Sequence, residues 1–166
     1  MNPNNKVLVL PHICGIELVA TNSPIPSIGT SLQPFYNTYV QNSTSKEAYV
    51  SPSKARYTES SKKVRAGLAH EQKLQLQFPS NDPLRVERIK EFIKIRYVYI
   101  KLSSGMVFYF GRNDLFQNSK PKIDITSSEN ITQITYTLQS IQPIGFTNGS
   151  FDFQLSEEFP ANFYNL

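Results

Sequence analysis

The sequence predicts a mainly β (α+β) protein: an antiparallel β-sandwich or barrel with one flanking α-helix over about residues 82–95 and a long extended arm or loop. Three observations support this fold class. Apolar and polar residues alternate in many segments after residue 67, which is the period of half-buried strands. Helical spacing of apolar residues is convincing in one segment. Charged residues make up 18% of the chain, below the usual value of about 25%, and neutral polar residues replace them, as is common in β-rich proteins.

The first part of the chain, residues 1–20, is predicted to contribute strands to the core. Residues 7–10 are a short β-prone run that ends at Pro11. Residues 13–20 are predicted to form a second strand, in which Gly15 marks a bulge or a point of close approach.

Residues 21–67 differ in character from the rest of the chain. They are polar or proline-containing and show no sustained apolar period, so they are predicted to form an extended arm or a long loop. The segment nevertheless contains several aromatic residues, which pure linkers rarely carry. We therefore expect it to dock on a neighbouring molecule.

Residues 68–166 are predicted to form the sandwich core with its single helix. Leu74, Leu76 and Phe78 alternate with polar residues, the pattern of a half-buried strand. In the helix over residues 82–95, Asn81 or Asp82 provides the cap and proline occupies the first helical position. The apolar stripe of this helix consists of Val86, Ile89, Phe92 and Ile93.

Residues 97–114 are predicted to form a hairpin around a Ser-Ser-Gly turn, with Gly105 supplying the positive φ angle. Both faces of this hairpin carry apolar residues. One face is expected to pack on the core, and the other to meet the helix, the arm or another subunit, because a monomer would otherwise expose a large apolar patch. Further strands are predicted over residues 122–126, 131–146 and 151–155, and an aromatic tail follows them.

Composition restricts the function classes. The 166 residues suit one domain or one domain with an arm, and the net charge of +4 is mild for a dedicated nucleic-acid binder. A single cysteine excludes an intrachain disulfide, and no segment approaches the roughly 20 apolar residues of a membrane helix. We therefore expect a soluble protein made in a reducing cytoplasm, without membrane association.

Candidate catalytic residues are few. His12 and Cys14 share one face if they lie on a strand, but spacing alone does not make a nucleophile–base pair, and a buried thiol is the favoured interpretation. Arg112 and Asp114 are favoured as a turn and an ion pair over a ligand site. The adjacent Glu157 and Glu158 point to opposite faces of a strand and do not form an acid–base pair. The sequence thus predicts no catalytic, cofactor or metal site.

Two sets of residues are candidates for binding. The exposed basic residues of the arm could contact nucleic acid through phosphates, although a solvated or partner-docking arm is the favoured interpretation. This basic patch comprises Lys54, Arg56, Lys62, Lys63 and Arg65. The aromatic residues expected at a subunit interface are Phe35, Tyr36, Tyr39, Tyr49, Tyr57, Tyr97, Tyr99, Tyr109, Phe163 and Tyr164.

The order of predicted elements resembles that of the tail-tube-like β-sandwich of tailed-phage structural proteins. It covers about residues 68–155 and depends on the run LQLQFPSNDPLRVERIKEFI…VYIKLSSGMVFYFG…TYTLQSIQPIGF. Tube, distal-tail and baseplate-hub proteins use this fold.

The resemblance implies a non-enzymatic structural subunit of a phage or phage-like particle. It would be tail-associated (tube, distal-tail or connector-like) and would form a homo-oligomeric ring that contacts other virion structural proteins. It would be assembled in the host cytoplasm and would end in the virion tail. The alternatives are a β-domain that binds nucleic acid or protein through a basic arm, and an enzyme that uses His12 and Cys14.

Overall fold

The computed structural model describes residues 10–20, 45–117 and 119–148, and these form a mainly β fold with two antiparallel sheets and one α-helix. The predicted fold class is confirmed. The five-stranded sheet has the order β2 (Lys46–Glu47), β1 (Ile13–Val19), β5 (Tyr97–Leu102), β6 (Met106–Phe110) and β9 (Gly145–Asn148). The four-stranded sheet has the order β3 (Arg56–Val64), β4 (Gly67–Pro79), β8 (Ile131–Ser140) and β7 (Lys122–Ser127).

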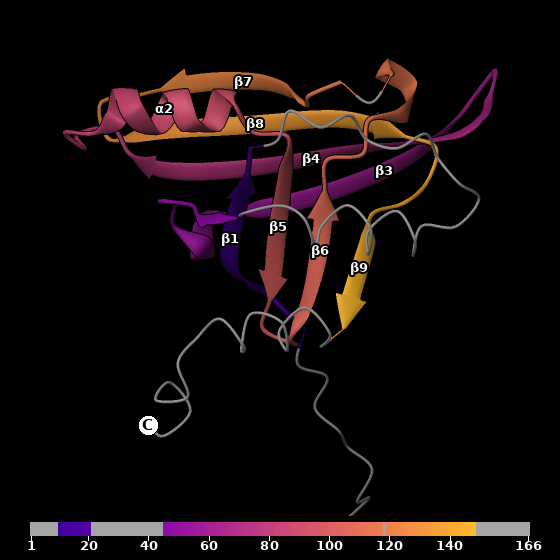
Figure 1. Cartoon of the computed structure of the whole chain (residues 1–166), viewed down its shortest axis with the longest axis horizontal. Helices are drawn as coiled ribbons and strands as arrows, with labels where there is room; N and C mark the ends of the chain where they lie inside the picture. Colours follow the sequence, from indigo (N-terminus) through magenta and orange to yellow (C-terminus); the bar gives the residue numbers. More distant parts are fainter. Residues whose placement is uncertain (1–9, 21–44, 118, 149–166) are drawn as a thin grey trace, which may run out of the picture.

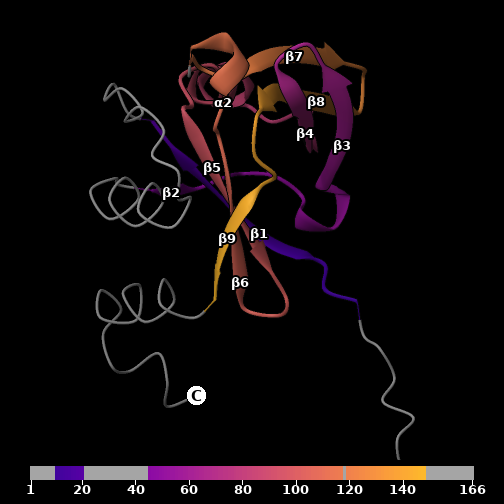
Figure 2. The ribbon, with the colours of Figure 1, turned by 90° about the vertical axis from the view of Figure 1, so that its right-hand side faces the viewer.

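The two sheets pack face to face with their strands crossing, and helix α2 (Arg85–Ile93) lies along the four-stranded sheet (Figure 1). A view from the side shows β3, β4, β7 and β8 together at one end of the strands β5 and β6 (Figure 2). Two short 3-10 helices, η1 (Pro52–Lys54) and η2 (Asp114–Phe116), interrupt the connections.

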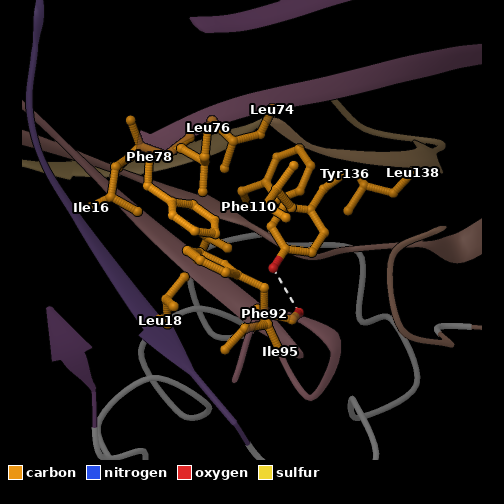
Figure 3. Packing of buried hydrophobic residues seen from close by; sticks show 13 residues of the cluster. Ile16, Leu18, Leu74, Leu76, Phe78, Phe92, Ile95, Phe110, Tyr136 and Leu138 are labelled. Carbon is orange, nitrogen blue, oxygen red and sulfur yellow. Dashed lines mark hydrogen bonds between the residues drawn. The ribbon is translucent and has the colours of Figure 1, made fainter. Parts of the chain in front are cut away.

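The core lies between the sheets because alternate side chains of each strand point inward. In β4, Leu74, Leu76 and Phe78 are almost fully buried, as their alternation predicts. Figure 3 shows the Phe78 ring stacked on Phe92 from α2, with ring centroids 5.7 Å apart. The Tyr136 hydroxyl donates a hydrogen bond of 2.7 Å to the Phe92 carbonyl, which joins β8 to the helix end.

Helix α2 begins later than predicted, at Arg85, and its apolar stripe is only partly buried. Asp82 still serves this end of the helix, because its Oδ1 accepts the Leu84 N–H at 2.9 Å. That bond, together with the nearby guanidinium of Arg88, lowers the pKa of Asp82. Phe92 is buried, but the exposed fractions of Val86 and Ile93 are 56% and 50%. The nine-residue helix therefore meets the core along a narrow edge.

The predicted arm over residues 21–67 is wrong in its second half. Residues 45–67 include β2, η1 and β3, and β3 pairs with β4 along its whole length, from Arg56 opposite Gln75 to Val64 opposite Gly67. The polarity that indicated an arm has a physical cause: β3 is an edge strand whose residues are mostly exposed. The rest of the predicted arm, residues 21–44, lies outside the described residues, as do the predicted strands over 7–10 (apart from Leu10) and 151–155.

The carboxylate of Glu59 accepts hydrogen bonds from β3, from β4 and from the segment that connects β8 to β9. Glu59 of β3 accepts hydrogen bonds from the Tyr57 hydroxyl at 2.9 Å and from the Gln72 amide at 3.0 Å. It also accepts the backbone N–H of Ile144, immediately before β9, at 2.9 Å. The β3–β4 hairpin is thereby connected to the segment that leads from the four-stranded sheet into the five-stranded one.

Candidate interaction surfaces

The three tyrosines of the β5–β6 hairpin do not form an open contact surface. Tyr97, Tyr99 and Tyr109 lie on the face of the five-stranded sheet opposite the core, as their alternation with Val98 and Ile100 predicts. Their exposed fractions within this single chain are 6%, 1% and 7%. The prediction that they are available to a neighbouring copy is therefore corrected: the chain itself hides them.

Two of the four tyrosines expected on the arm, Tyr49 and Tyr57, belong to the folded domain. Tyr57 is half-buried in β3 and packs edge-on against Phe110 of β6, with ring centroids 6.3 Å apart. Tyr49 is 49% exposed, and the Arg88 guanidinium lies 3.6 Å from its ring centroid. The other predicted interface residues, Phe35, Tyr36, Tyr39, Phe163 and Tyr164, lie outside the described residues.

The predicted basic patch is exposed but is spread along one strand. Lys54 ends η1, Arg56 and Lys62 are in β3, and Arg65 lies in the turn after it. Arg56 and Lys62 share the outer face of the four-stranded sheet, and their spacing of six residues separates them by about 20 Å. Lys63 points to the opposite face of the strand.

A weaker basic region occupies the middle of that outer face. Lys73 of β4 pairs with Glu71 at 3.1 Å, and Lys62 lies nearby. The hydrogen bond from Lys73 is the largest cause of a lowered pKa of Glu71, and the charges of Lys73 and Lys62 add to it. Across the sheet, Lys73 and Lys122 both stand opposite Thr137 of β8. The sequence places Lys62 and Lys73 in one basic stretch but does not connect them with Lys122, which reaches this face from a separate strand.

Helix α2 presents an apolar ridge to solvent. Val86 and Ile93, which we call the α2 ridge, are seven residues apart and therefore lie on the same side of the helix, two turns from each other. Both are at least half exposed. Lys90, also exposed, lies between them in the sequence.

His12 immediately precedes β1, and Cys14 lies within β1 at a bulge. The pairing of β1 with β5 shifts register between Ile13 and Gly15, which confirms the predicted bulge and breaks the regular alternation around Cys14. The Cys14 thiol lies 3.5 Å from the Lys101 carbonyl oxygen. Contrary to the interpretation as a buried thiol, Cys14 is exposed, because the bulge turns it away from the core.

Residues Gly111–Asp114, which we call the anchor segment, are held by a buried polar network. The Arg112 Nε donates to both carboxylate oxygens of Asp114, at 2.9 and 2.7 Å. The Asp114 carboxylate also accepts the Ser140 hydroxyl at 2.9 Å and the Ile141 N–H at 3.1 Å. The side chains of Arg112 and Asp114 are only 2% and 3% exposed, in keeping with their interpretation as an ion pair.

The start of the anchor segment depends on glycine. Gly111 has a φ angle of +152°, and a Cβ atom there would lie 2.5 Å from Cδ1 of Tyr97. Its carbonyl accepts a hydrogen bond of 2.6 Å from the buried Arg96 guanidinium. The backbone therefore passes close against β5, an approach that a side chain at this position would block.

Residues 10–20, 45–117 and 119–148 contain no group of three or more His, Cys, Asp or Glu side chains placed to hold a metal ion. In the same part of the chain, no helix has both the length and the apolar character needed to cross a bilayer.

Comparison of the chain with protein-family models, with curated proteins and with solved structures finds no match.

Proposed function

We propose that this protein is a non-enzymatic structural subunit that assembles into a homo-oligomeric ring, as a tail-associated component of a phage or phage-like particle. The α2 ridge is the observation that carries the proposal. Val86 and Ile93 expose half or more of their surface to water, and fully burying such a side chain stabilises a structure by about 1.5–3 kcal/mol. Covering the ridge with a neighbouring copy would recover part of that free energy.

The architecture supports the same proposal. A β-sandwich with one flanking helix is the arrangement that the resemblance to tail structural proteins implies. A single ridge that contacts a different patch on the next copy gives head-to-tail contacts, and these close into a ring when the rotation between copies allows it. The buried hairpin tyrosines take no part in such contacts, so the ridge replaces them as the expected interface.

The assembly is tested by measuring the mass of the full-length protein by sedimentation velocity over a range of concentrations. We expect a species several times heavier than the 18.9 kDa chain. The variant Val86→Ser/Ile93→Ser should dissociate at concentrations where the wild type is assembled. Leu68→Ser provides a matched control, because Leu68 is 54% exposed but lies in β4 at the tip of the β3–β4 hairpin. A wild type that stays monomeric would refute the proposal.

The place in a particle is tested separately. Mass spectrometry of purified particles from the source of the gene should detect peptides of this chain in a constant ratio to the other tail components. Absence of the chain from complete particles would refute the virion assignment while leaving an oligomer possible.

A second candidate function is nucleic-acid binding, which the exposed Arg56, Lys62 and Lys73 favour. Neutralising phosphates with these side chains would give an affinity that falls steeply as salt rises. The variant Arg56→Gln/Lys62→Gln/Lys73→Gln should abolish such binding in a fluorescence-anisotropy assay. Affinity that is insensitive to salt would exclude this function.

A further inference from the structure

A pocket of about 470 Å³ opens beside β8, at the edge of the four-stranded sheet. Its position follows from the pairing of the strands: β7 starts at Lys122, opposite Thr137, while β8 continues to Ser140. The last part of β8 therefore lacks a β7 partner. Instead, the Oδ1 atom of Asn113 accepts the Gln139 N–H at 3.0 Å. The pocket is lined by this end of β8 and by residues between Asn113 and Lys122.

The wall of the pocket opposite β8 is fixed by hydrogen bonds among its own residues. The Asn113 side chain, which is 3% exposed, directs its amide nitrogen at the Ser119 carbonyl, 3.3 Å away. Backbone hydrogen bonds of 3.0 Å from Phe116 to Asn113 and from Ser119 to Phe116 close the turn. The adjoining Asp114 is fixed by Arg112 and Ser140. A wall fixed in this way loses little conformational freedom when a ligand binds.

The lining combines an apolar ring with two cations. Phe116 lines the pocket with its side chain 55% exposed, and Lys120 and Lys122 line it as well. The lining contains no aspartate or glutamate. Lys122 lies 3.4 Å from Asp124, in a well-exposed pair of the kind that water screens strongly. Lys73 also stands opposite Thr137, but it is paired with Glu71, which stands opposite Gln139, so the net positive charge of the pocket comes from Lys120 and Lys122.

We propose that this pocket binds a small organic anion, a phosphate or carboxylate attached to an apolar or aromatic group. The anion contacts the ammonium groups of Lys120 and Lys122, and the apolar group packs on the ring of Phe116. Thr137 and Gln139 offer neutral hydrogen-bonding groups on the β8 side. The volume lies within the range of about 300–1,000 Å³ found for small-molecule sites. This site is independent of the α2 ridge and of the proposed assembly.

The test uses the ¹⁵N-labelled full-length protein and three probes: phenyl phosphate, inorganic phosphate and phenol. Phenyl phosphate should shift the backbone amide signals of residues 113–117, 119, 120, 122 and 137–139 in a saturable manner. Inorganic phosphate should shift the same signals with weaker affinity, and phenol should shift them least. This order is expected because the first probe uses both the lysines and the ring, whereas each of the other two uses one of them.

Substitutions of the lining residues test where the anion binds. In Lys120→Gln/Lys122→Gln the affinity for phenyl phosphate should fall about tenfold or more, because both charge-assisted contacts to the anion are lost. Lys54→Gln/Lys63→Gln removes the same charge at a distance and should bind as the wild type does. Phe116→Ser should reduce the preference for phenyl phosphate over inorganic phosphate. If the double variant fails to fold, Lys120→Gln and Lys122→Gln are compared singly with Lys120→Arg, which should keep its affinity.

Three results would overturn the proposal. One is the absence of saturable shifts with phenyl phosphate, and another is a set of shifts centred elsewhere on the protein. The third is an affinity that is unchanged when Lys120 and Lys122 are neutralised. None of these results would bear on whether the protein assembles, which the sedimentation experiment decides.

Discussion

Replacing Asp114 with alanine tests the energetic role of the anchor segment. The substitution removes a carboxylate that receives both hydrogen bonds from Arg112 Nε and one each from Ser140 and the Ile141 backbone. The Arg112 side chain, 2% exposed, would keep its charge but lose this carboxylate. The cost therefore arises mainly because a buried guanidinium loses its carboxylate partner while it stays out of water, rather than from the loss of one contact.

The expected magnitude is large. Removing one partner of a buried ion pair costs about 3–5 kcal/mol, against a total unfolding free energy of about 5–15 kcal/mol for a typical domain. The double variant Arg112→Met/Asp114→Leu removes both charges and should cost less than Asp114→Ala alone, because the buried ion pair is replaced as a unit by apolar side chains. The two substitutions should thus be strongly non-additive.

The assay is urea unfolding at pH 7, followed by far-UV circular dichroism and by tyrosine fluorescence, since the chain has nine tyrosines and no tryptophan. Equal slopes of the unfolding free energy against urea would show that the variants unfold from comparably compact states. The reasoning would be refuted if Asp114→Ala cost less than about 1 kcal/mol, because breaking a buried pair must cost more than breaking an exposed one. It would also be refuted if the double variant cost the sum of the two single ones.

Three other substitutions give expected outcomes in the same assay. Gly111→Ala should cost about 2 kcal/mol or more, because its Cβ would lie 2.5 Å from Tyr97 Cδ1 in a backbone conformation that disfavours side chains; an unchanged midpoint would contradict this. Leu76→Ala should cost about 2–5 kcal/mol, since Leu76 is fully buried in the core, and a cost below this range would mean that the site collapses readily. Tyr136→Phe should cost about 1 kcal/mol at pH 7 through loss of the hydrogen bond to the Phe92 carbonyl. Burial raises the pKa of Tyr136, so above about pH 10 the unfolded chain ionises at this residue while the native state does not. The wild type then loses stability that Tyr136→Phe does not lose, and the gap between them should narrow with rising pH; a constant gap would contradict the linkage.

The sequence predicts the fold best where one face of an element is buried and the other is exposed to solvent. The alternation of Leu74, Leu76 and Phe78 identified β4 because burial selects every second residue there. The strand β3 was missed since, as an edge strand, it buries little and its sequence carries no apolar alternation. The position of α2 was predicted, but the exposure of Val86 and Ile93 was not, because periodicity cannot tell how wide a contact the core offers.

The candidate sites were harder to predict for a related reason. Alternation predicts which residues share a face of a strand, but the rest of the fold decides what covers that face. For this reason the hairpin tyrosines were predicted to contact a neighbouring subunit, whereas they are buried within the chain. The pocket beside β8 is lined by Phe116, by Lys120 and Lys122, and by residues of β8 that follow Phe116 by more than 20 positions. No local pattern links residues that only the register between β7 and β8 brings together.

The hydrogen bond between Glu59 and the Ile144 N–H, just before β9, bears on strand exchange between copies of this chain. β9 has four strand residues, Gly145–Asn148, and occupies the edge of its sheet among the described strands. A short edge strand near the chain end can be given up to the same site on another copy with every ladder bond remade, which is strand exchange. The bond from the Ile144 N–H to Glu59 keeps β9 with its own protomer. Strand exchange therefore has to break this hydrogen bond before β9 can leave its protomer.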